Sequence, residues 1–368
     1  MKTKKLQQIF GFVLFHCSFL GTLRAQPERY FPDLPGYKTL VCDLHTHTVF
    51  SDGLVWPTVR VDEAVRENLD AIALTDHVEY QPHKDDIPIN RNRPYALAAE
   101  QAGKKNILLI KGAEITKDTP PGHYNALFLF DIDLLDRPQL LDAMENANLQ
   151  EGFVFWNHHA WKGVEKGRWE AVQTAMLEKK WLHGLEVANG EDYYPLAHQW
   201  CLEKNLTMVG NSDIHAPSDF FPYSAQRHRT LTLVFAEERT VGAVQKALFA
   251  GRTAVWFSNQ LIGRPEYLEP MFHACLTCAV LPVKDEGTLV VKFSNTALID
   301  LELLTEGLAE APRITVPARS TISVALKADS PKSALVLSCE VSNFLIAPGK
   351  GLPVRISLDV PTSAAVSD

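Results

Sequence analysis

The amino-acid sequence predicts an α/β chain: a closed or nearly closed (β/α) barrel followed by a small β-sandwich. Between residues 40 and 257, short apolar and β-branched runs alternate with amphipathic stretches of helical period, which is typical of parallel strands joined by helices. Seven such runs are more than a small open sheet needs, and they suit a barrel. After about residue 265 the helical period fades and short strand-like runs separated by turn residues follow, as in a β-sandwich.

The expected barrel strands are the apolar runs at residues 40–44, 71–74, 107–110, 125–130, 153–156, 185–188 and 207–210. Helices are expected between most of them, at residues 57–68, 94–105, 138–147, 169–180 and 195–204. Several of these helices begin with proline, which suits a first turn because the N–H that proline lacks has no partner there. The barrel should end less regularly, with a strand at 230–235, a helix at 241–250 and a strand at 254–257. The sandwich strands are expected at 289–293, 298–304, 322–326, 334–339 and 354–358.

The first 25 residues have the order of a secretory signal peptide. Three lysines precede an apolar run at residues 9–23, and a small residue, Ala25, precedes the expected cleavage point. The alternative is an N-terminal membrane anchor, but the run is shorter than the ~20 residues that a membrane span needs. We therefore expect an exported chain, periplasmic or extracellular, with a signal peptide at 1–25, the barrel at 26–262 and the sandwich at 263–368.

Composition and charge exclude two classes of protein. The chain has 368 residues, 46% of them hydrophobic and 22% charged, which is enough for a buried core and unlike a disordered protein. There are 36 basic and 44 acidic residues, a net charge of -8 that becomes -12 once the four basic residues of the signal peptide are removed. Such a charge argues against unspecific binding to nucleic acid or anionic lipid.

Cysteine usage does not indicate a disulfide scaffold or a zinc ribbon. Five cysteines remain after the signal peptide, and Cys275-x-x-Cys278 lacks the second pair that a zinc ribbon requires. Cys275 and Cys278 could form a local disulfide outside the cytosol, or they could be two buried thiols.

The candidate chemistry lies at the ends of the expected barrel strands. Of the 13 histidines, 12 precede residue 230, and His45 and His47 directly follow the first strand. Their i, i+2 spacing places both imidazoles on one face of the strand. Seven more groups lie at or beside strand ends, mostly the carboxyl ends, where barrel active sites are built; they are Asp52, His77, Glu114, His123, His158, Asp213 and His215.

This collection of six imidazoles and three carboxylates predicts a metal centre. A lone histidine at a strand end is more often a loop residue with a hydrogen-bond partner than a ligand. Nine such groups packed together without metal would need a costly network of desolvated polar atoms. Nitrogen and oxygen ligands without thiolate fit Zn, Mn or Fe, and there are more ligands than one ion needs.

The motifs around these residues resemble those of the PHP (polymerase and histidinol phosphatase) superfamily over residues 36–260. The resemblance is carried by Asp43-Leu44-His45-Thr46-His47, Ser51-Asp52-Gly53, Leu74-Thr75-Asp76-His77, Gly112-Ala113-Glu114-Ile115, Trp156-Asn157-His158 and Asn211-Ser212-Asp213-Ile214-His215. With the exported N-terminus and the β-rich tail, the chain is most similar to the exported bacterial Sb-PDE-type phosphodiesterases of that superfamily.

The resemblance implies a distorted (β/α)7 barrel that holds two or three divalent ions. It assigns His45, His47, Glu114 and Asp213 to one ion, Glu114, His123 and His158 to a second, and Asp52, His77 and His215 to a third. The fifth-strand motif is usually His-Pro in the family, whereas this chain has His158-His159, so two imidazoles compete for that position.

The resemblance also implies a mechanism, in which a metal-bridged hydroxide attacks a phosphate ester. Asp213 is the expected proton acceptor. His159 is a candidate leaving-group acid, although a structural histidine among aromatic residues is at least as good an interpretation. Arg227 and His228 are candidate substrate contacts, with a solvated basic loop as the alternative.

These features favour hydrolysis of a small organic phosphodiester. A phosphomonoesterase on the same trinuclear site is the nearest alternative, and a non-catalytic binding protein stabilised by metals is another. Nuclease action on long nucleic acid is disfavoured by the acidic charge. Trp56, Trp156, Trp161 and Tyr193 lie near strand ends, but packing is the commoner role of such aromatic residues, and they do not indicate a substrate.

Overall fold

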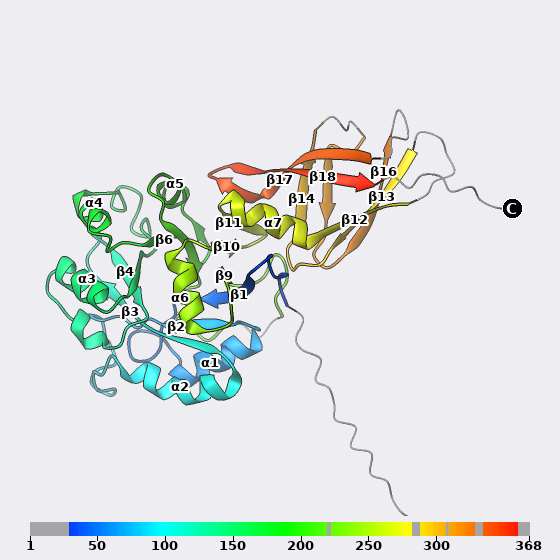
Figure 1. Cartoon of the computed structure of the whole chain (residues 1–368). Helices are drawn as coiled ribbons and strands as arrows, with labels where there is room; N and C mark the ends of the chain where they lie inside the picture. Colours follow the sequence, from blue (N-terminus) through cyan, green and yellow to red (C-terminus); the bar gives the residue numbers. More distant parts are fainter. Residues whose placement is uncertain are drawn as a thin grey trace, which may run out of the picture.

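The structure is a computed structural model of the whole chain (Figure 1), and it describes residues 29–218, 222–281, 288–306, 308, 310–327 and 334–359. The expected signal peptide lies outside the described residues. A barrel-like α/β domain at the N-terminal end and a β-sandwich at the C-terminal end share one 15-stranded sheet. None of the helices in the described ranges is long and apolar enough to cross a membrane.

The strands of the barrel run in two parallel groups. The first group is β1 (Lys38–Asp43), β2 (Ala71–Leu74) and β3 (Leu108–Thr116), and the second is β5 (Phe153–Trp156), β6 (Gly184–Asn189) and β8 (Thr207–Asn211). Between the groups lies β4 (His123–Leu127), which is antiparallel to both of its neighbours. On the other side of β1, β9 (Leu231–Ala236) and β10 (Thr253–Phe257) continue the sheet in antiparallel fashion. The expectation of parallel strands is therefore wrong for β4, and the less regular end expected of the barrel is formed by the antiparallel strands β9 and β10.

The helices match the expected positions within a few residues. They are α1 (Pro57–Arg66), α2 (Arg93–Lys105), the 3-10 helix η1 (Ile132–Leu135), α3 (Leu140–Leu149), α4 (Ala171–Glu178), α5 (Pro195–Glu203) and α6 (Val241–Phe249). Proline at the first turn opens α1, α2 and α5, as the sequence predicts. The interior of the barrel is apolar, with Leu40, Ile110, Phe155, Val209 and Val234 among its buried side chains.

Threonine side chains of β9 and β10, instead of a ladder of backbone hydrogen bonds, connect these strands to β8 (Thr207–Asn211). In the described part of the chain, β8 pairs along its length with β6 alone. The Thr232 hydroxyl of β9 accepts from the Gly210 N–H (3.0 Å) and donates to the Gly210 carbonyl (2.8 Å). Thr253 of β10 donates to the Met208 carbonyl at 2.6 Å. A Cβ at Gly210 would lie 2.2 Å from Val255 Cγ1, so only glycine allows this close approach.

The C-terminal domain is a two-layered β-sandwich. One layer contains β12 (Leu276–Leu281), β13 (Thr288–Asn295) and β16 (Thr321–Lys327). The other contains β14 (Leu301–Thr305), β15 (Arg313–Val316), β17 (Ala334–Ala347) and β18 (Lys350–Asp359). Buried residues such as Phe293 and Val341 belong to an apolar cluster that also includes Trp256 of the barrel, so the two domains share a core.

A helix and a short strand join the barrel to the sandwich. The strand β11 (Gln260–Gly263) pairs with β10 on one side and, in parallel, with β17 on the other. The helix α7 (Pro265–Cys275) follows it, so the expected loss of helical structure after residue 265 is wrong for this segment. Its buried residues Leu268, Met271, Phe272 and Cys275 have helical spacing. The cysteines of the described ranges, Cys275 and Cys278 included, are all free thiols.

Candidate metal centre

All nine imidazole and carboxylate groups that the sequence singles out lie at one rim of the barrel. His45 and His47 follow β1, and an isolated bridge between Thr46 and Ile214 joins their segment to the one that follows β8. A second bridge pairs His77, after β2, with Glu114 near the end of β3. Because β4 is reversed, its first residue, His123, lies opposite Thr116 at the same rim. His123, at the start of β4, therefore lies at the same rim as the groups at the ends of β1, β2 and β3.

The first group surrounds the imidazoles of His45 and His47. Their Nε2 atoms are 3.1 Å apart, and they lie 3.2 and 3.0 Å, respectively, from Asp213 Oδ1. Both are 3.4 Å from Glu114 Oε2. Ligand atoms of a tetrahedral zinc site with bonds of ~2.1 Å are about 3.4 Å apart. The spacing of these four side chains therefore suits one ion.

The second group lies on the other oxygen of Glu114. Glu114 Oε1 is 2.9 Å from His123 Nδ1 and 3.5 Å from His158 Nε2. His158 Nε2 is in turn 3.6 Å from Asp213 Oδ2. Glu114 and Asp213 thus each present one oxygen to the first group and the other oxygen to the second.

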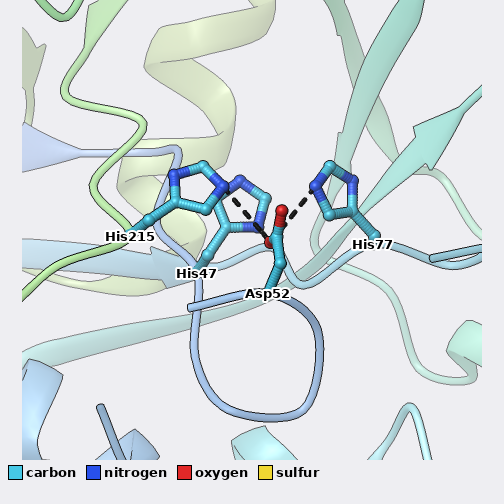
Figure 2. A group of neighbouring side chains, drawn as sticks. All are labelled: His47, Asp52, His77 and His215. Atoms are coloured by element: carbon cyan, nitrogen blue, oxygen red, sulfur yellow. Dashed lines mark ion pairs between the residues drawn. The ribbon is translucent and has the colours of Figure 1, made fainter. Parts of the chain in front are cut away.

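The third group surrounds Asp52, and Figure 2 shows the imidazoles that point toward it. Asp52 Oδ1 is 3.2 Å from His215 Nε2 and 3.4 Å from His77 Nε2. His47 Nδ1 lies 3.7 Å from the same oxygen, and the His47 and His215 rings stack with centroids 4.1 Å apart. The ligand atoms of His47, Asp52, His77 and His215 all lie within 4.8 Å of one another.

Neighbouring imidazoles keep the carboxylates of the centre ionised. Burial opposes ionisation of Glu114, but His77 and His45 hold the pKa of this carboxyl well below its ordinary value. The pKa of Asp213 and that of Asp52 are likewise lowered, against the effect of burial, by their imidazole neighbours. Burial lowers the pKa of His77, but Glu114 and Asp52 outweigh it and raise the pKa to about 10. Among the described residues, Asp52, Glu114 and Asp213 form ion pairs with histidines and with no lysine or arginine.

Buried atoms without a hydrogen bond show that the residues fit metal ions. Asp52 Oδ1, Asp213 Oδ1 and His158 Nδ1 are buried and have no hydrogen bond within the described chain. Buried polar atoms without a partner are rare and costly, and a divalent cation would satisfy the two carboxylate oxygens. Lone pairs of nitrogen and oxygen converge without lysine or arginine, as the chemistry of a zinc, manganese or iron site requires.

Comparison with known proteins assigns a family to this centre. A solved structure of a two-domain protein from Bacteroides vulgatus, containing a predicted PHP-like metal-dependent phosphoesterase, is 43% identical to this chain. The two superpose with a TM-score of 0.84 over 91% of this chain and 100% of that one. The chain belongs to the PHP family. The PHP domain family matches residues 43–191, and an Ig-like domain family matches residues 279–357 of the sandwich.

A more distant relative is an uncharacterized protein of Methanocaldococcus jannaschii, 28% identical over 31% of this chain. This chain spans 65% of the length of that curated relative.

Around the centre of this PHP domain, a buried carboxylate that the sequence analysis missed orients the imidazole of His45 and holds the backbone of His158. Glu186 of β6 accepts from His45 Nδ1 (2.9 Å) and Asn211 Nδ2 (3.0 Å) with one oxygen. Its other oxygen accepts from the His158 N–H (2.9 Å) and Asn189 Nδ2 (2.8 Å). A carboxylate at Nδ1–H fixes the tautomer that leaves the Nε2 lone pair free for a metal. The sequence feature that could have indicated this role is the position of Glu186, a charged residue inside the apolar run at 185–188.

Two further side chains hold the loops that carry the ligands. Asp76 accepts three hydrogen bonds of 2.7 Å, from the Thr48 N–H, the Thr48 hydroxyl and the Ser51 hydroxyl, and so fixes the segment between His47 and Asp52. Arg60 of α1 donates to the carbonyls of His47, Ile214, His215 and Ala216, and to the Glu63 carboxylate.

The structure places the candidate catalytic acid and substrate contacts in other surroundings. His159 is buried among aromatic rings, with Nδ1 2.7 Å from the Gly167 carbonyl. His228 stacks on Trp256 near the sandwich, and its ring nitrogens face two backbone carbonyls. Arg227 is exposed in a turn. Their roles in catalysis and substrate binding stay predictions.

Two exposed aromatic side chains flank the centre of the PHP domain. Trp161 is 49% exposed, and its ring centroid lies 5.5 Å from that of His123 and 5.9 Å from that of His158. Tyr80 is 52% exposed and lies 5.9 Å from the ring of His77. Each of these residues therefore places an exposed aromatic ring beside a candidate ligand imidazole.

Proposed function

We propose that this PHP protein is a metal-dependent phosphoesterase that hydrolyses small organic phosphodiesters. The observation that carries the proposal is the convergence of nine nitrogen- and oxygen-bearing side chains at one rim, including two buried carboxylate oxygens that accept no hydrogen bond. The relative from Bacteroides vulgatus supports the phosphoesterase class. The choice of a diester follows the resemblance to exported phosphodiesterases.

The residues of the centre would hold two or three divalent ions. The resemblance assigns His45, His47, Glu114 and Asp213 to the first ion, Glu114, His123 and His158 to the second, and Asp52, His77 and His215 to the third. The ligand atoms within the second set and within the third set lie close together, His47 also lies near the third set, and Asp213 lies near His45 and His158. When bound, such ions would lower the pKa of coordinated water towards ~7 and offset the charge of a phosphate oxyanion. Zn, Mn and Fe all suit this ligand set.

Asp213 is the residue proposed to accept the proton of the attacking water. Its side chain is 19% exposed, so substrate and water can reach it. The lowered pKa keeps the carboxylate ionised, and therefore able to accept a proton, at neutral pH. The backbone of Asp213 has φ of 52°, a left-handed conformation that is uncommon outside glycine, and its N–H donates to the His45 carbonyl at 3.0 Å. Such strain at a site with several ligands is typical of functional residues.

Residues 1–25, with their basic start and apolar run, support the further proposal that the enzyme acts outside the cytosol. Its substrates would then be small esters of the periplasm or the surroundings of the cell. The acidic charge of the chain favours small esters over long nucleic acid.

The test combines metal analysis with two chromogenic substrates. We expect the purified protein to contain divalent metal and to cleave bis(4-nitrophenyl) phosphate. His45→Ala and Asp213→Ala should lower this activity by about 1,000-fold or more. The matched control is His83→Ala, because His83 is exposed and outside the centre.

Three outcomes contradict parts of the proposal. Unchanged activity in both His45→Ala and Asp213→Ala would refute the role of the centre in catalysis. Rapid cleavage of 4-nitrophenyl phosphate without turnover of the diester would indicate a phosphomonoesterase. Metal binding without cleavage of any ester would indicate a binding protein stabilised by metals.

A further inference from the structure

The loop between β5 and α4, residues 158–168, is a compact structure that carries Trp161. The Trp161 N–H donates to the His158 carbonyl at 3.0 Å, and the Gly163 N–H donates to the Ala160 carbonyl at 2.8 Å. The Gly167 N–H returns to the Gly163 carbonyl at 3.2 Å. Successive turns of this kind leave the backbone little freedom, because each one fixes the residues that it closes.

His159 closes the base of this loop. Its Nδ1 lies 2.7 Å from the Gly167 carbonyl, so one ring nitrogen is occupied by the backbone. The ring packs against Trp156, Tyr194 and Trp200, with centroids 5.0 to 5.6 Å away. A Cβ at position 167 would lie 2.1 Å from the His159 carbonyl oxygen, so the two ends of the loop can meet only if residue 167 is glycine.

Trp161 is presented by this loop at the edge of the metal centre. Its indole meets two candidate ligand rings, those of His123 and His158, and about half of its surface remains open to solvent. The ammonium of Lys162 lies 4.6 Å from the centroid of the same ring. A planar apolar surface beside a cation and beside a centre suited to phosphate matches a ligand that joins a planar ring to a phosphate anion.

Tyr80 is equally exposed but meets a single ligand ring, that of His77. The fixed loop and the double contact single out Trp161 as the better-placed surface for a substrate group.

We propose that Trp161 is a specificity-determining residue that stacks on a planar aryl or heteroaryl group esterified to the phosphate of the substrate. His159 and Gly167 are positioning residues that hold the loop. This inference rests on the proposed function, since it names the class of ester that the same centre binds.

The test compares two phosphate diesters of similar size that differ in the planarity of their rings, diphenyl phosphate and dicyclohexyl phosphate. The metal-loaded protein should bind diphenyl phosphate about three- to tenfold more tightly, measured both as inhibition of ethyl 4-nitrophenyl phosphate cleavage and by titration calorimetry. Trp161→Ala should bind the two diesters with about equal affinity, and Trp161→Phe should retain most of the preference for diphenyl phosphate.

Two further variants separate stacking from a general disturbance of the loop. Val164→Ala is the matched control, because Val164 is a 54% exposed apolar residue of the same loop, and it should leave the preference unchanged. Gly167→Ala should lower the preference as Trp161→Ala does, with the metal content of the protein unchanged.

A wild-type protein without preference for the planar ester, or a preference that persists in Trp161→Ala, would overturn the inference. The calorimetric titration needs no turnover. If no ester is cleaved but the preference is present and depends on Trp161, the proposed function fails while the assignment of Trp161 as the stacking surface stands.

Discussion

Two groups of buried charged residues lie close to β1, and they are neutralised in different ways. In the first, carboxylates face guanidinium groups of the chain itself: Arg60 pairs with Glu63 at 2.6 Å, and Arg229 lies 2.9 Å from Glu67 and 3.4 Å from Asp43. In the second, the ion-pair partners of Asp52, Glu114 and Asp213 among the described residues are imidazoles.

The difference separates structural charge from functional charge. Where arginine supplies the cation, the charges are used to join elements, and Arg60 ties α1 to the segments that carry His47 and His215. Where the described chain supplies no arginine or lysine to the carboxylates, they remain available to ions from solution. We infer that the guanidinium network positions the loops and that the imidazole centre binds the metals.

The largest effect on activity should come from Glu114, the carboxylate that the first two ligand groups share and that also contacts His77 of the third. Glu114 has imidazole contacts in each of them, so Glu114→Gln should lower diesterase activity by about 1,000-fold or more and reduce bound metal. Steady-state rates and elemental analysis measure the two effects. If Glu114→Gln kept full activity and a full complement of metal, the assignment of the imidazole-paired carboxylates to metal binding would be contradicted.

The guanidinium network should show its role as a loss of stability. Arg60→Met leaves Glu63 without its cation and removes one donor from each of four carbonyls, so we expect about 3–5 kcal/mol lower free energy of unfolding. Denaturant titration measures this change. Arg313→Met is the control, because Arg313 is 61% exposed and 3.7 Å from its partner Glu302, and it should cost less than about 1 kcal/mol. Equal effects in the two variants would contradict the account.

Glu186 has both a structural and a functional role, because it is a buried carboxylate that orients a candidate metal ligand, His45. Glu186→Gln keeps the shape of the side chain but places an amide N–H₂ against two of its four donors, which weakens the support of the His45 and His158 segments. Metal affinity should fall about 10- to 100-fold, measured by competition with a chelator. Glu178→Gln on the exposed end of α4 is the matched control and should leave affinity unchanged. An unaltered affinity in Glu186→Gln would show that the orientation of His45 is set elsewhere.

The smallest effect concerns His183, a half-buried histidine without a recorded carboxylate contact among the described residues. His183 packs between Phe153 and Phe249, and its Nδ1 accepts from the Val154 N–H at 2.9 Å. Burial, offset in part by the Lys180 carbonyl, lowers its pKa to about 4. His77 in the metal centre shifts in the opposite direction because of its carboxylates.

The sign of the pH effect of His183 follows from proton uptake. In the unfolded chain the imidazole is protonated below pH ~6.5, whereas in the folded chain it stays neutral down to about pH 4. Its contribution to stability is therefore present above pH ~6.5 and lost as the pH falls toward 4, by about 1–2 kcal/mol after allowance for its partial exposure. His183→Asn keeps an acceptor for Val154 and should flatten the fall in a series of denaturant titrations. An identical slope in the variant and the wild type would contradict this assignment.

Much of the centre is readable from the sequence because β-strand geometry is local. The i, i+2 spacing of His45 and His47 and the position of His77 just after β2 place these groups at one rim of any sheet with this strand order. His123 reached the same rim through a reversed strand, which the spacing of residues does not reveal.

The features that sequence reasoning missed depend on long-range contacts. Glu186 was hidden in an apolar run, and its role exists only where the segments of His45, His158 and Asn211 meet. The loop of Trp161 depends on the contact between His159 and Gly167, eight residues apart. The helix α7 was missed because its apolar face packs on the shared core, while Pro270 in its interior weakens the helical pattern.

The most direct test of the central claim is a metal titration of the metal-free protein with Zn²⁺ or Mn²⁺, followed by calorimetry and checked by elemental analysis. We predict that the wild type binds two or three ions, that Glu114→Gln binds fewer, and that chelation abolishes activity reversibly. A protein that binds no divalent ion, or a Glu114→Gln variant that binds as many as the wild type, would contradict the account.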